Sequence, residues 1–258
     1  MATAKQVISG LSGILGVPYS TIEAYSSELR RVGWWPKTKR GRGAVAMSDN
    51  DAAKLLLAIL AHGPKSLAGG TQDNLTKVDG SGFFIRHSDM LVRDTSSPDF
   101  LALKSLIGIS DDLRFLDLIS AILTHLKENS DGGVFSEKPF FASVYDSIYK
   151  KVEVLFAVSG PYPSAEFRCF LKDQHLKKLI ADGILPAASN GILSVGFVHE
   201  VVGHLLTARR AEQDTKPYAD IAVAIRSESE RGLSTRVGFG GRELLAVARE
   251  LRRNVGDS

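Results

Sequence analysis

The sequence is short of cysteine and of long apolar runs, and each shortage excludes a class of protein. Cys169 is the only cysteine among 258 residues, which excludes an internal disulfide and a zinc site built from several cysteines. No apolar run approaches the roughly 18 residues that a membrane-spanning helix needs, so we expect no membrane partner. The first ten residues lack the basic, apolar and small-residue order of a secretory signal. We therefore expect a cytoplasmic protein.

Positive charge is divided unevenly along the chain. Residues 1–62 contain eight Lys or Arg and four Asp or Glu, a net charge of +4, whereas the remaining residues contain 24 and 25, a net charge of −1. All of the excess positive charge therefore lies in the first quarter of the sequence. Such asymmetry predicts a polyanionic partner for that quarter.

Three helices are predicted in this basic quarter, over residues 3–16, 20–32 and 49–62, because apolar residues recur in each at helical spacing. Ser20, followed three residues later by a glutamate, has the spacing of a capping box, and Ser48 is the expected cap of the third helix. Between the second and third helices, Trp34-Trp35 and residues 44–47 are expected to be short strands on either side of the basic turn PKTKRGRG. One of the two tryptophans is expected to pack inward and the other against this turn.

Residues 11–30 have the spacing of a helix-turn-helix. Ser12 is small enough for two helices to cross closely, and Gly16 stands where the turn demands a left-handed residue. With the basic turn and the capped helix that follow, residues 5–60 resemble the winged helix-turn-helix DNA-binding domain of MerR-type regulators. The resemblance implies that the second helix enters the major groove of double-stranded DNA and that the wing contacts the backbone or the minor groove. Unlike in that family, no long coiled-coil dimerisation helix follows.

The expected DNA contacts divide by chemistry. The exposed amino-terminal face of the second helix is expected to read base edges, and the basic residues after it to bind phosphates. Arg40 and Arg42, separated by a glycine, suit a wing tip in a narrow minor groove. About six phosphate contacts predict a slope of log affinity against log salt of roughly −5. The candidate DNA-binding residues are Tyr19, Ser20, Thr21, Glu23, Ala24, Ser27, Arg30, Arg31, Lys37, Lys39, Arg40 and Arg42.

The rest of the chain predicts a second, α+β domain with an antiparallel sheet. The domains are expected at 1–64 (winged helix-turn-helix) and 83–258 (oligomerisation or sensing), joined by the polar, glycine-rich linker 65–82. Helices are expected at 98–108, 111–128 and 242–253, and strands at 83–87, 151–158, 165–171, 192–202, 219–227 and 234–238, with the second and third of these strands forming a hairpin.

Three motifs that hint at other chemistry are given plainer interpretations. His199 and His204 are five positions apart in the sequence, whereas the two histidines of a zinc-protease helix are four positions apart, so no metal site is expected. The glycines at 238–241 lack the lysine and serine of a phosphate-binding loop, and they fit a strand-to-helix turn. Cys169 alternates with apolar residues along a strand, as a core residue does. We therefore expect neither catalysis nor a cofactor.

The sequence predicts a sequence-specific transcription regulator that binds double-stranded DNA as a homodimer or higher oligomer, in a prokaryotic or phage setting. Any small-molecule or protein effector is left unidentified. A DNA-architecture, partition or phage genome-packaging protein that uses the same fold as an anchor is the first alternative. A solvated basic loop beside a protein-binding helical pair, and an enzyme whose activity resides in the second domain, are the others.

Overall fold

The fold is mixed helix and sheet. The structure is a computed structural model that describes residues 2–31, 33–36, 46–62, 90–129, 133–135, 154–159, 164–198, 236–239 and 241–252. In these ranges the helices are α1 (Ala4–Leu15), α2 (Tyr19–Arg31), α3 (Asp49–His62), α6 (Pro98–Ile107), α7 (Phe115–Glu128), α8 (Asp173–Ala181) and α11 (Gly241–Arg252). The strands are β1 (Leu91–Val92), β2 (Val154–Ser159), β3 (Ser164–Phe170), β4 (Ile192–Val198) and β5 (Arg236–Phe239). This confirms the α+β class.

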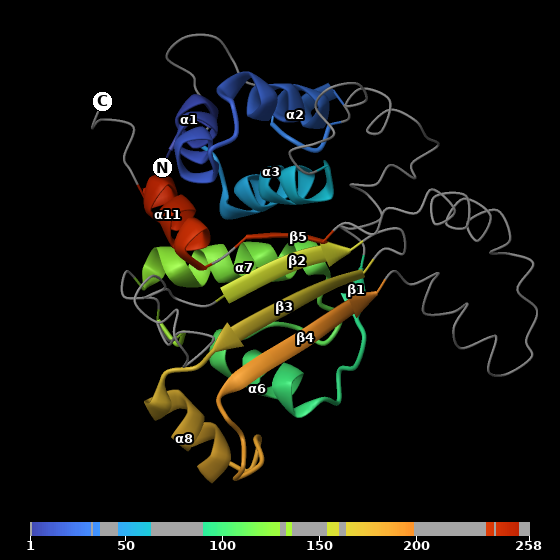
Figure 1. Cartoon of the computed structure of the whole chain (residues 1–258), viewed down its shortest axis with the longest axis vertical. Helices are drawn as coiled ribbons and strands as arrows, with labels where there is room; N and C mark the ends of the chain where they lie inside the picture. The colour runs from blue at the N-terminus through green and yellow to red at the C-terminus, as the bar shows by residue number, and fades with distance from the viewer. Residues whose placement is uncertain are drawn as a thin grey trace, which may run out of the picture.

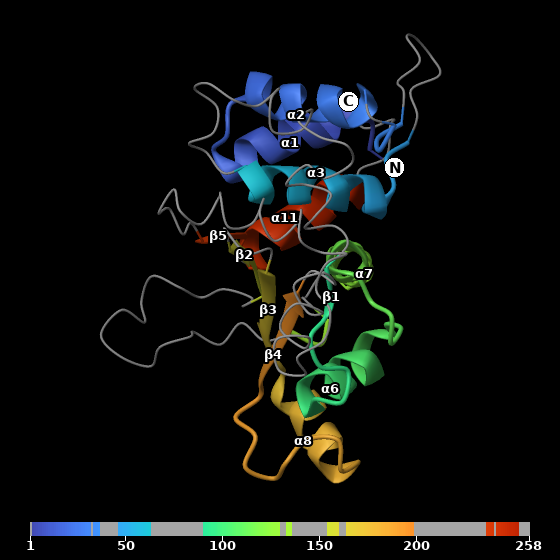
Figure 2. The ribbon, with the colours of Figure 1, turned by 90° about the vertical axis from the view of Figure 1, so that its right-hand side faces the viewer.

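All five strands form one antiparallel sheet in the order β1-β4-β3-β2-β5. The predicted hairpin is confirmed, with Phe156 opposite Phe167 in β2 and β3. Alternate residues of β3 and β4, among them Phe167 and Phe197, are buried on one face. Phe197 packs there against Phe115 at the start of α7, with ring centroids 5.1 Å apart. Figure 2 shows α6 and α7 on one side of the sheet.

The outer edge of β4 is covered partly by β1 and partly by the start of α6. β1 pairs with Phe197 and Val198, and the Gly196 carbonyl accepts the Arg93 amide at 2.8 Å. Beyond the end of β1, the Ser194 amide donates to the Asp99 carboxylate at 2.9 Å. Asp99 lies in the first turn of α6, so this helix continues the cover that the two-residue strand begins.

The amino-terminal helices stack on the β5 end of the sheet together with the last helix (Figure 1). Helix α3 contacts α7, β2 and β5, and α1 contacts α11. The approach of α1 to α11 is close, because a Cβ atom built on Gly10 would lie 2.8 Å from Cγ of Glu250. Buried side chains run without interruption from α1 to α11. In the described ranges, the two predicted domains 1–64 and 83–258 therefore share one hydrophobic core. The boundary between these domains stays a prediction, because the predicted linker 65–82 lies outside the described residues.

Several predicted elements need correction. Trp34 and Trp35 do not form a strand, because their amides both donate to the Leu29 carbonyl and close the end of α2. Helix α7 begins at Phe115 rather than at 111, after a turn that contains Asp111. Helix α8 and strand β1 were not predicted. As predicted, the glycines at 238–241 fall where a strand gives way to a helix, since β5 ends at Phe239 and α11 begins at Gly241.

Other predicted elements fall where the structure gives no description. These are the strands at 83–87 and 219–227, residues 199–202 of the fourth strand, and residues 37–45 of the wing. Among the helices that are described, none has both the length and the apolar character required to cross a membrane.

Candidate nucleic-acid interface

The turn between α1 and α2 is fixed by a left-handed glycine and by three hydrogen bonds. Gly16 ends α1 with φ of +65°, in the left-handed region that glycine adopts without strain. The Ser12 hydroxyl donates to the Val17 carbonyl at 2.8 Å, so this side chain fastens the turn as well as being small. The Pro18 carbonyl then accepts the Thr21 and Ile22 amides at 3.0 and 3.2 Å. These bonds fix the direction in which α2 leaves α1.

The start of α2 differs from the prediction at one residue. Helix α2 begins at Tyr19, so Ser20 lies inside its first turn and is not the cap. The correction has a local cause, since the Pro18 carbonyl accepts the Thr21 and Ile22 amides, two first-turn amides that would have no backbone partner in a helix capped at Ser20. Ser20 is exposed and remains available to a partner.

Helix α2 has one buried and one exposed face. Ile22, Tyr25 and Leu29 are no more than 1% exposed, and Ser26 between them is fully buried and donates to the Glu23 carbonyl. The opposite face consists of exposed residues at helical spacing. These residues are Ser20, Glu23, Ala24, Ser27 and Arg31. Five of the candidate DNA-binding residues thus lie together on the solvent side of one helix.

Two further candidates at the start of α2 are less available. Tyr19 and Thr21 are half-buried, and the Tyr19 side chain packs against the hydrophobic core. An aromatic side chain held in this way supports the helix and leaves only part of its surface to a partner. The main surface offered by α2 is therefore the stripe of five exposed residues.

The two arginines at the end of α2 have different surroundings. Arg31 is exposed and pairs with Glu28 at 2.7 Å across a turn of the helix. Arg30 is half-buried, and its guanidinium carbon lies 4.9 Å from the centre of the Trp35 ring. Stacking on an indole stabilises a guanidinium and restricts its motion. Arg31 is thus the more accessible of the two, whereas Arg30 holds the end of α2 against Trp35.

Trp35 joins α2 to the start of α3. Its side chain is 2% exposed, and its indole N–H donates to the Asp51 carbonyl at 2.9 Å. Asp51 also completes the predicted Ser48 cap of α3, because the Ser48 hydroxyl accepts the Asp51 amide at 3.1 Å while the Asp51 carboxylate accepts the Ser48 amide at 3.0 Å. The expectation that one tryptophan packs inward is confirmed for Trp35. Sequence reasoning missed its hydrogen bond to α3, although two adjacent tryptophans in a chain that has no others mark the place.

The remaining candidate residues, Lys37, Lys39, Arg40 and Arg42, lie outside the described residues. The chain on either side of them is held by the helices. On one side stands the buried Trp35, and on the other the Met47 amide donates to the Ala2 carbonyl at 2.9 Å. The described residues that flank this basic stretch therefore lie beside the amino-terminal helices.

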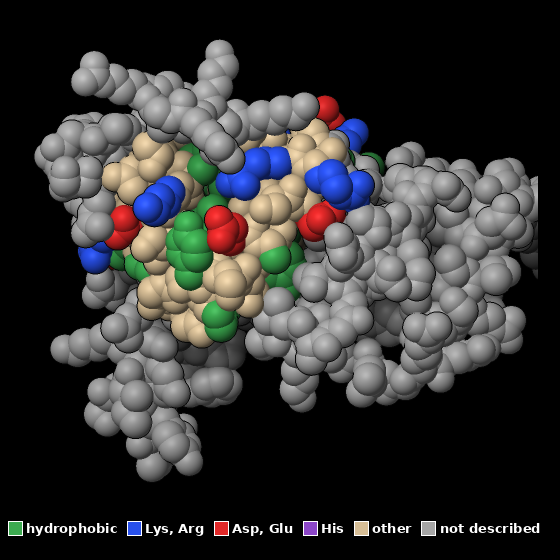
Figure 3. All heavy atoms as spheres, turned by 90° about the horizontal axis from the view of Figure 1, so that it is seen from above, with side chains coloured by type: hydrophobic (Ala, Val, Ile, Leu, Met, Phe, Trp, Pro, Cys, Tyr) green, Lys and Arg blue, Asp and Glu red, His purple; other side chains and the backbone are tan. Residues whose placement is uncertain are grey.

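The surface over α1 and α2 is of mixed charge in the part that the structure describes. Figure 3 shows this end of the molecule, with lysine and arginine side chains spread over it and acidic side chains between them. Surface charge alone therefore does not single out α2, which is distinguished instead by its two different faces and by the basic sequence that follows it.

The described ranges contain no group of three or more His, Cys, Asp or Glu side chains arranged to bind a metal, and the pair His199 and His204 lies outside these ranges. Cys169 is 1% exposed, and its burial raises the pKa of the thiol far above its ordinary value, as the Asp99 charge does to a lesser extent. A thiol held in this way is a core group, as predicted, and a poor nucleophile.

Comparison of the chain with protein-family models, with curated proteins and with solved structures finds no match.

Proposed function

We propose that the chain binds double-stranded DNA through α2 and acts as a sequence-specific transcription regulator. The observation that carries the proposal is the two-sided character of α2, which has a fully buried stripe against α1 and α3 and an exposed stripe from Ser20 to Arg31. A helix fixed by its inner face beside a tight turn can insert its outer face into a major groove without rearrangement. The net charge of +4 over residues 1–62 supplies attraction to phosphate.

The exposed stripe suits base reading by its chemistry. Serine hydroxyls bond to either donors or acceptors, the Ala24 methyl fits against a thymine methyl, and Glu23 can accept from cytosine. Arg31 and the basic residues from Lys37 to Arg42 would supply contacts to phosphates. Recognition helices of this kind commonly act in pairs related by a two-fold axis, so we propose a homodimer on a palindromic site.

The experiment is selection of bound fragments from random and genomic DNA by the whole chain at two salt concentrations. Ala24→Glu and Ser27→Glu place a carboxylate on the exposed face of α2 and leave its buried face intact. Ser105→Glu, at an exposed position of α6, adds the same charge away from the site and is the matched control.

The proposal expects a defined motif that both α2 variants lose and the control keeps. Salt-sensitive binding without a motif would favour a DNA-architecture, partition or packaging role. No binding by the wild-type chain at low salt, or equal binding by the α2 variants and the control, would overturn the assignment of α2.

A further inference from the structure

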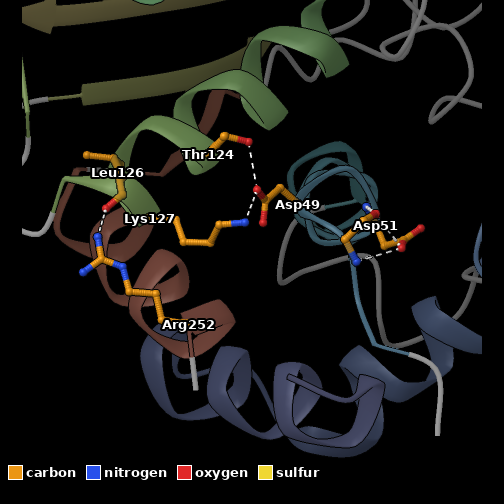
Figure 4. Close-up of polar contacts among 7 residues, drawn as sticks. Asp49, Asp51, Thr124, Leu126, Lys127 and Arg252 are labelled. Carbon is orange, nitrogen blue, oxygen red and sulfur yellow. Dashed lines mark hydrogen bonds and ion pairs between the residues drawn. The ribbon is translucent and has the colours of Figure 1, made fainter. Parts of the chain in front are cut away.

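The last turn of α7 forms hydrogen bonds to both α3 and α11. The Asp49 carboxylate, at the first residue of α3, accepts the Thr124 hydroxyl at 2.8 Å and the Lys127 ammonium at 2.5 Å. One residue before Lys127, the Leu126 carbonyl accepts the Arg252 guanidinium from α11 at 2.9 Å. Figure 4 shows the Asp49 side chain of α3 and the Lys127 side chain of α7 directed at each other. A single helical turn thus fixes two elements that are far apart in sequence.

The ion pair is largely withdrawn from solvent. The side chains of Asp49 and Lys127 are 13% and 28% exposed, whereas those of Lys104 and Asp111, another ion pair of the chain, are 39% and 68% exposed. Removing one partner of a shielded pair leaves the other charge poorly compensated, which an exposed pair avoids. The carboxylate also lies at the amino-terminal end of α3, where the helix dipole favours negative charge. The position of the first turn of α3 therefore depends on α7.

From Asp49 the contacts continue to the end of α2. Asp51 follows two residues later, and its carbonyl accepts the Trp35 indole. The Trp35 ring lies under the Arg30 guanidinium of α2. Asp49 and Asp51 are joined by the backbone of α3 and the other steps are direct contacts, so a shift of the α3 start displaces the anchor of the carboxyl-terminal end of α2. Contiguous packed and hydrogen-bonded groups of this kind carry energetic coupling between distant sites.

We infer that Asp49 and Lys127 are positioning residues for nucleic-acid binding, which set the placement of α2 from α7 through Trp35. The inference rests on the proposed function. It makes the α+β part of the chain a participant in DNA affinity, since whatever displaces the last turn of α7 displaces the proposed recognition helix as well.

The test uses Asp49→Asn and Lys127→Met in the whole chain. Asparagine can still accept the Thr124 hydroxyl and methionine retains most of the lysine stem, so each change removes mainly the charge pairing. Each single variant should bind DNA roughly three- to tenfold more weakly than the wild type. The double variant should bind no worse than either single one, since the pair is already broken. Lys127→Arg, which keeps the charge, should retain most of the affinity, and Lys104→Met is the matched control in the exposed pair.

A spectroscopic readout separates positioning from loss of fold. Trp34 and Trp35 are the only tryptophans, so in a Trp34→Phe background the emission comes from Trp35 alone. Lys127→Met should shift that emission to longer wavelength at unchanged helix content, and Lys104→Met should not. Unchanged emission and unchanged DNA affinity in Lys127→Met would overturn the inference and leave the proposed function standing. Failure of the wild-type chain to bind DNA would instead overturn the proposed function, and the inference with it.

Discussion

The indole N–H of Trp35 donates to the backbone carbonyl of Asp51 across 16 residues of sequence, at 2.9 Å. The bond lies between the end of one helix of the proposed DNA-binding unit and the start of the next. It is formed by a side chain that is 2% exposed, so water does not compete for it.

Trp35→Phe should lower the free energy of unfolding by about 1–3 kcal/mol, because it deletes the hydrogen bond to Asp51 and leaves a small cavity. Urea unfolding followed by circular dichroism measures the change. Trp34→Phe, at the half-buried neighbour, should cost clearly less. Equal losses in the two variants would show that Trp35 has no special anchoring role.

Arg31→Ala and Arg30→Ala should have different effects. Arg31 is exposed, so its loss should leave unfolding nearly unchanged while it reduces the salt slope of DNA binding by about 1. Loss of Arg30 removes the contact with the Trp35 ring and should lower stability by about 0.5–1 kcal/mol. Unfolding curves and binding isotherms at several salt concentrations distinguish the two. A reversed pattern would contradict the assigned roles.

Gly133→Ala should destabilise the fold by about 2–5 kcal/mol. Gly133 has φ of +59°, and a Cβ atom there would lie 2.0 Å from Nε2 of His125, a ring nitrogen that accepts the Val134 amide at 3.2 Å. Gly108→Ala is the matched control, because Gly108 has φ of +68° and open space around it. Its cost should be that of the left-handed backbone alone, about 1–2 kcal/mol. Thermal unfolding of the two variants would refute the steric explanation if their midpoints were the same.

Cys169 should resist thiol reagents in the folded chain and react once the chain unfolds. The side chain is 1% exposed on the buried face of β3, so the reagent has no approach and little thiolate is present. Labelling with a chromogenic disulfide at increasing urea should follow the unfolding curve. Fast stoichiometric labelling in buffer would contradict the burial of this strand.

Because the Cys169 thiol is buried, we expect the free energy of unfolding to fall in alkaline solution. Burial raises the pKa of Cys169 above its ordinary value of 9.0, so above that pH the unfolded chain loses a proton that the folded chain keeps. The stabilising contribution is complete below pH 9.0 and declines as the pH rises further, by at most about 1.4 kcal/mol per pH unit. Unfolding of the wild type and of Cys169→Ala at several alkaline pH values isolates this contribution, and parallel pH profiles would refute it.

Much of the secondary structure could be predicted because strong periodicity coincides with burial. The α7 segment has apolar residues at helical spacing, and β3 alternates buried Phe167 with half-buried Arg168, so both patterns were readable. Helix α8 was missed because its sequence DQHLKKLIA is mostly polar and its only buried residue is Leu179. Strand β1 is two residues long, which is too short for any alternation to show.

The candidate site could be predicted only as far as local spacing reaches. Gly16 and the two faces of α2 follow from the order of residues within a few helical turns. The stacking of Arg30 on Trp35, and the bonds that tie Asp49 to Thr124 and Lys127, join residues whose proximity depends on the whole fold. Nothing in the spacing of such residues indicates that they meet.

The hydrogen bond from Ser194 to Asp99 bears on how two copies of this chain could associate. An exposed edge strand invites another chain to add a strand to the sheet. On β4 the Ser194 amide, which lies beyond the end of β1, already donates to the Asp99 carboxylate. An incoming strand would therefore place its carbonyl oxygen against a negative charge and find no free amide to accept from. Self-association by sheet extension is therefore disfavoured at this edge, and Asp99→Ala would weaken the barrier to it. A homodimer that reads a palindrome would therefore have to form at another surface, either at the β5 edge of the sheet or through helices and loops.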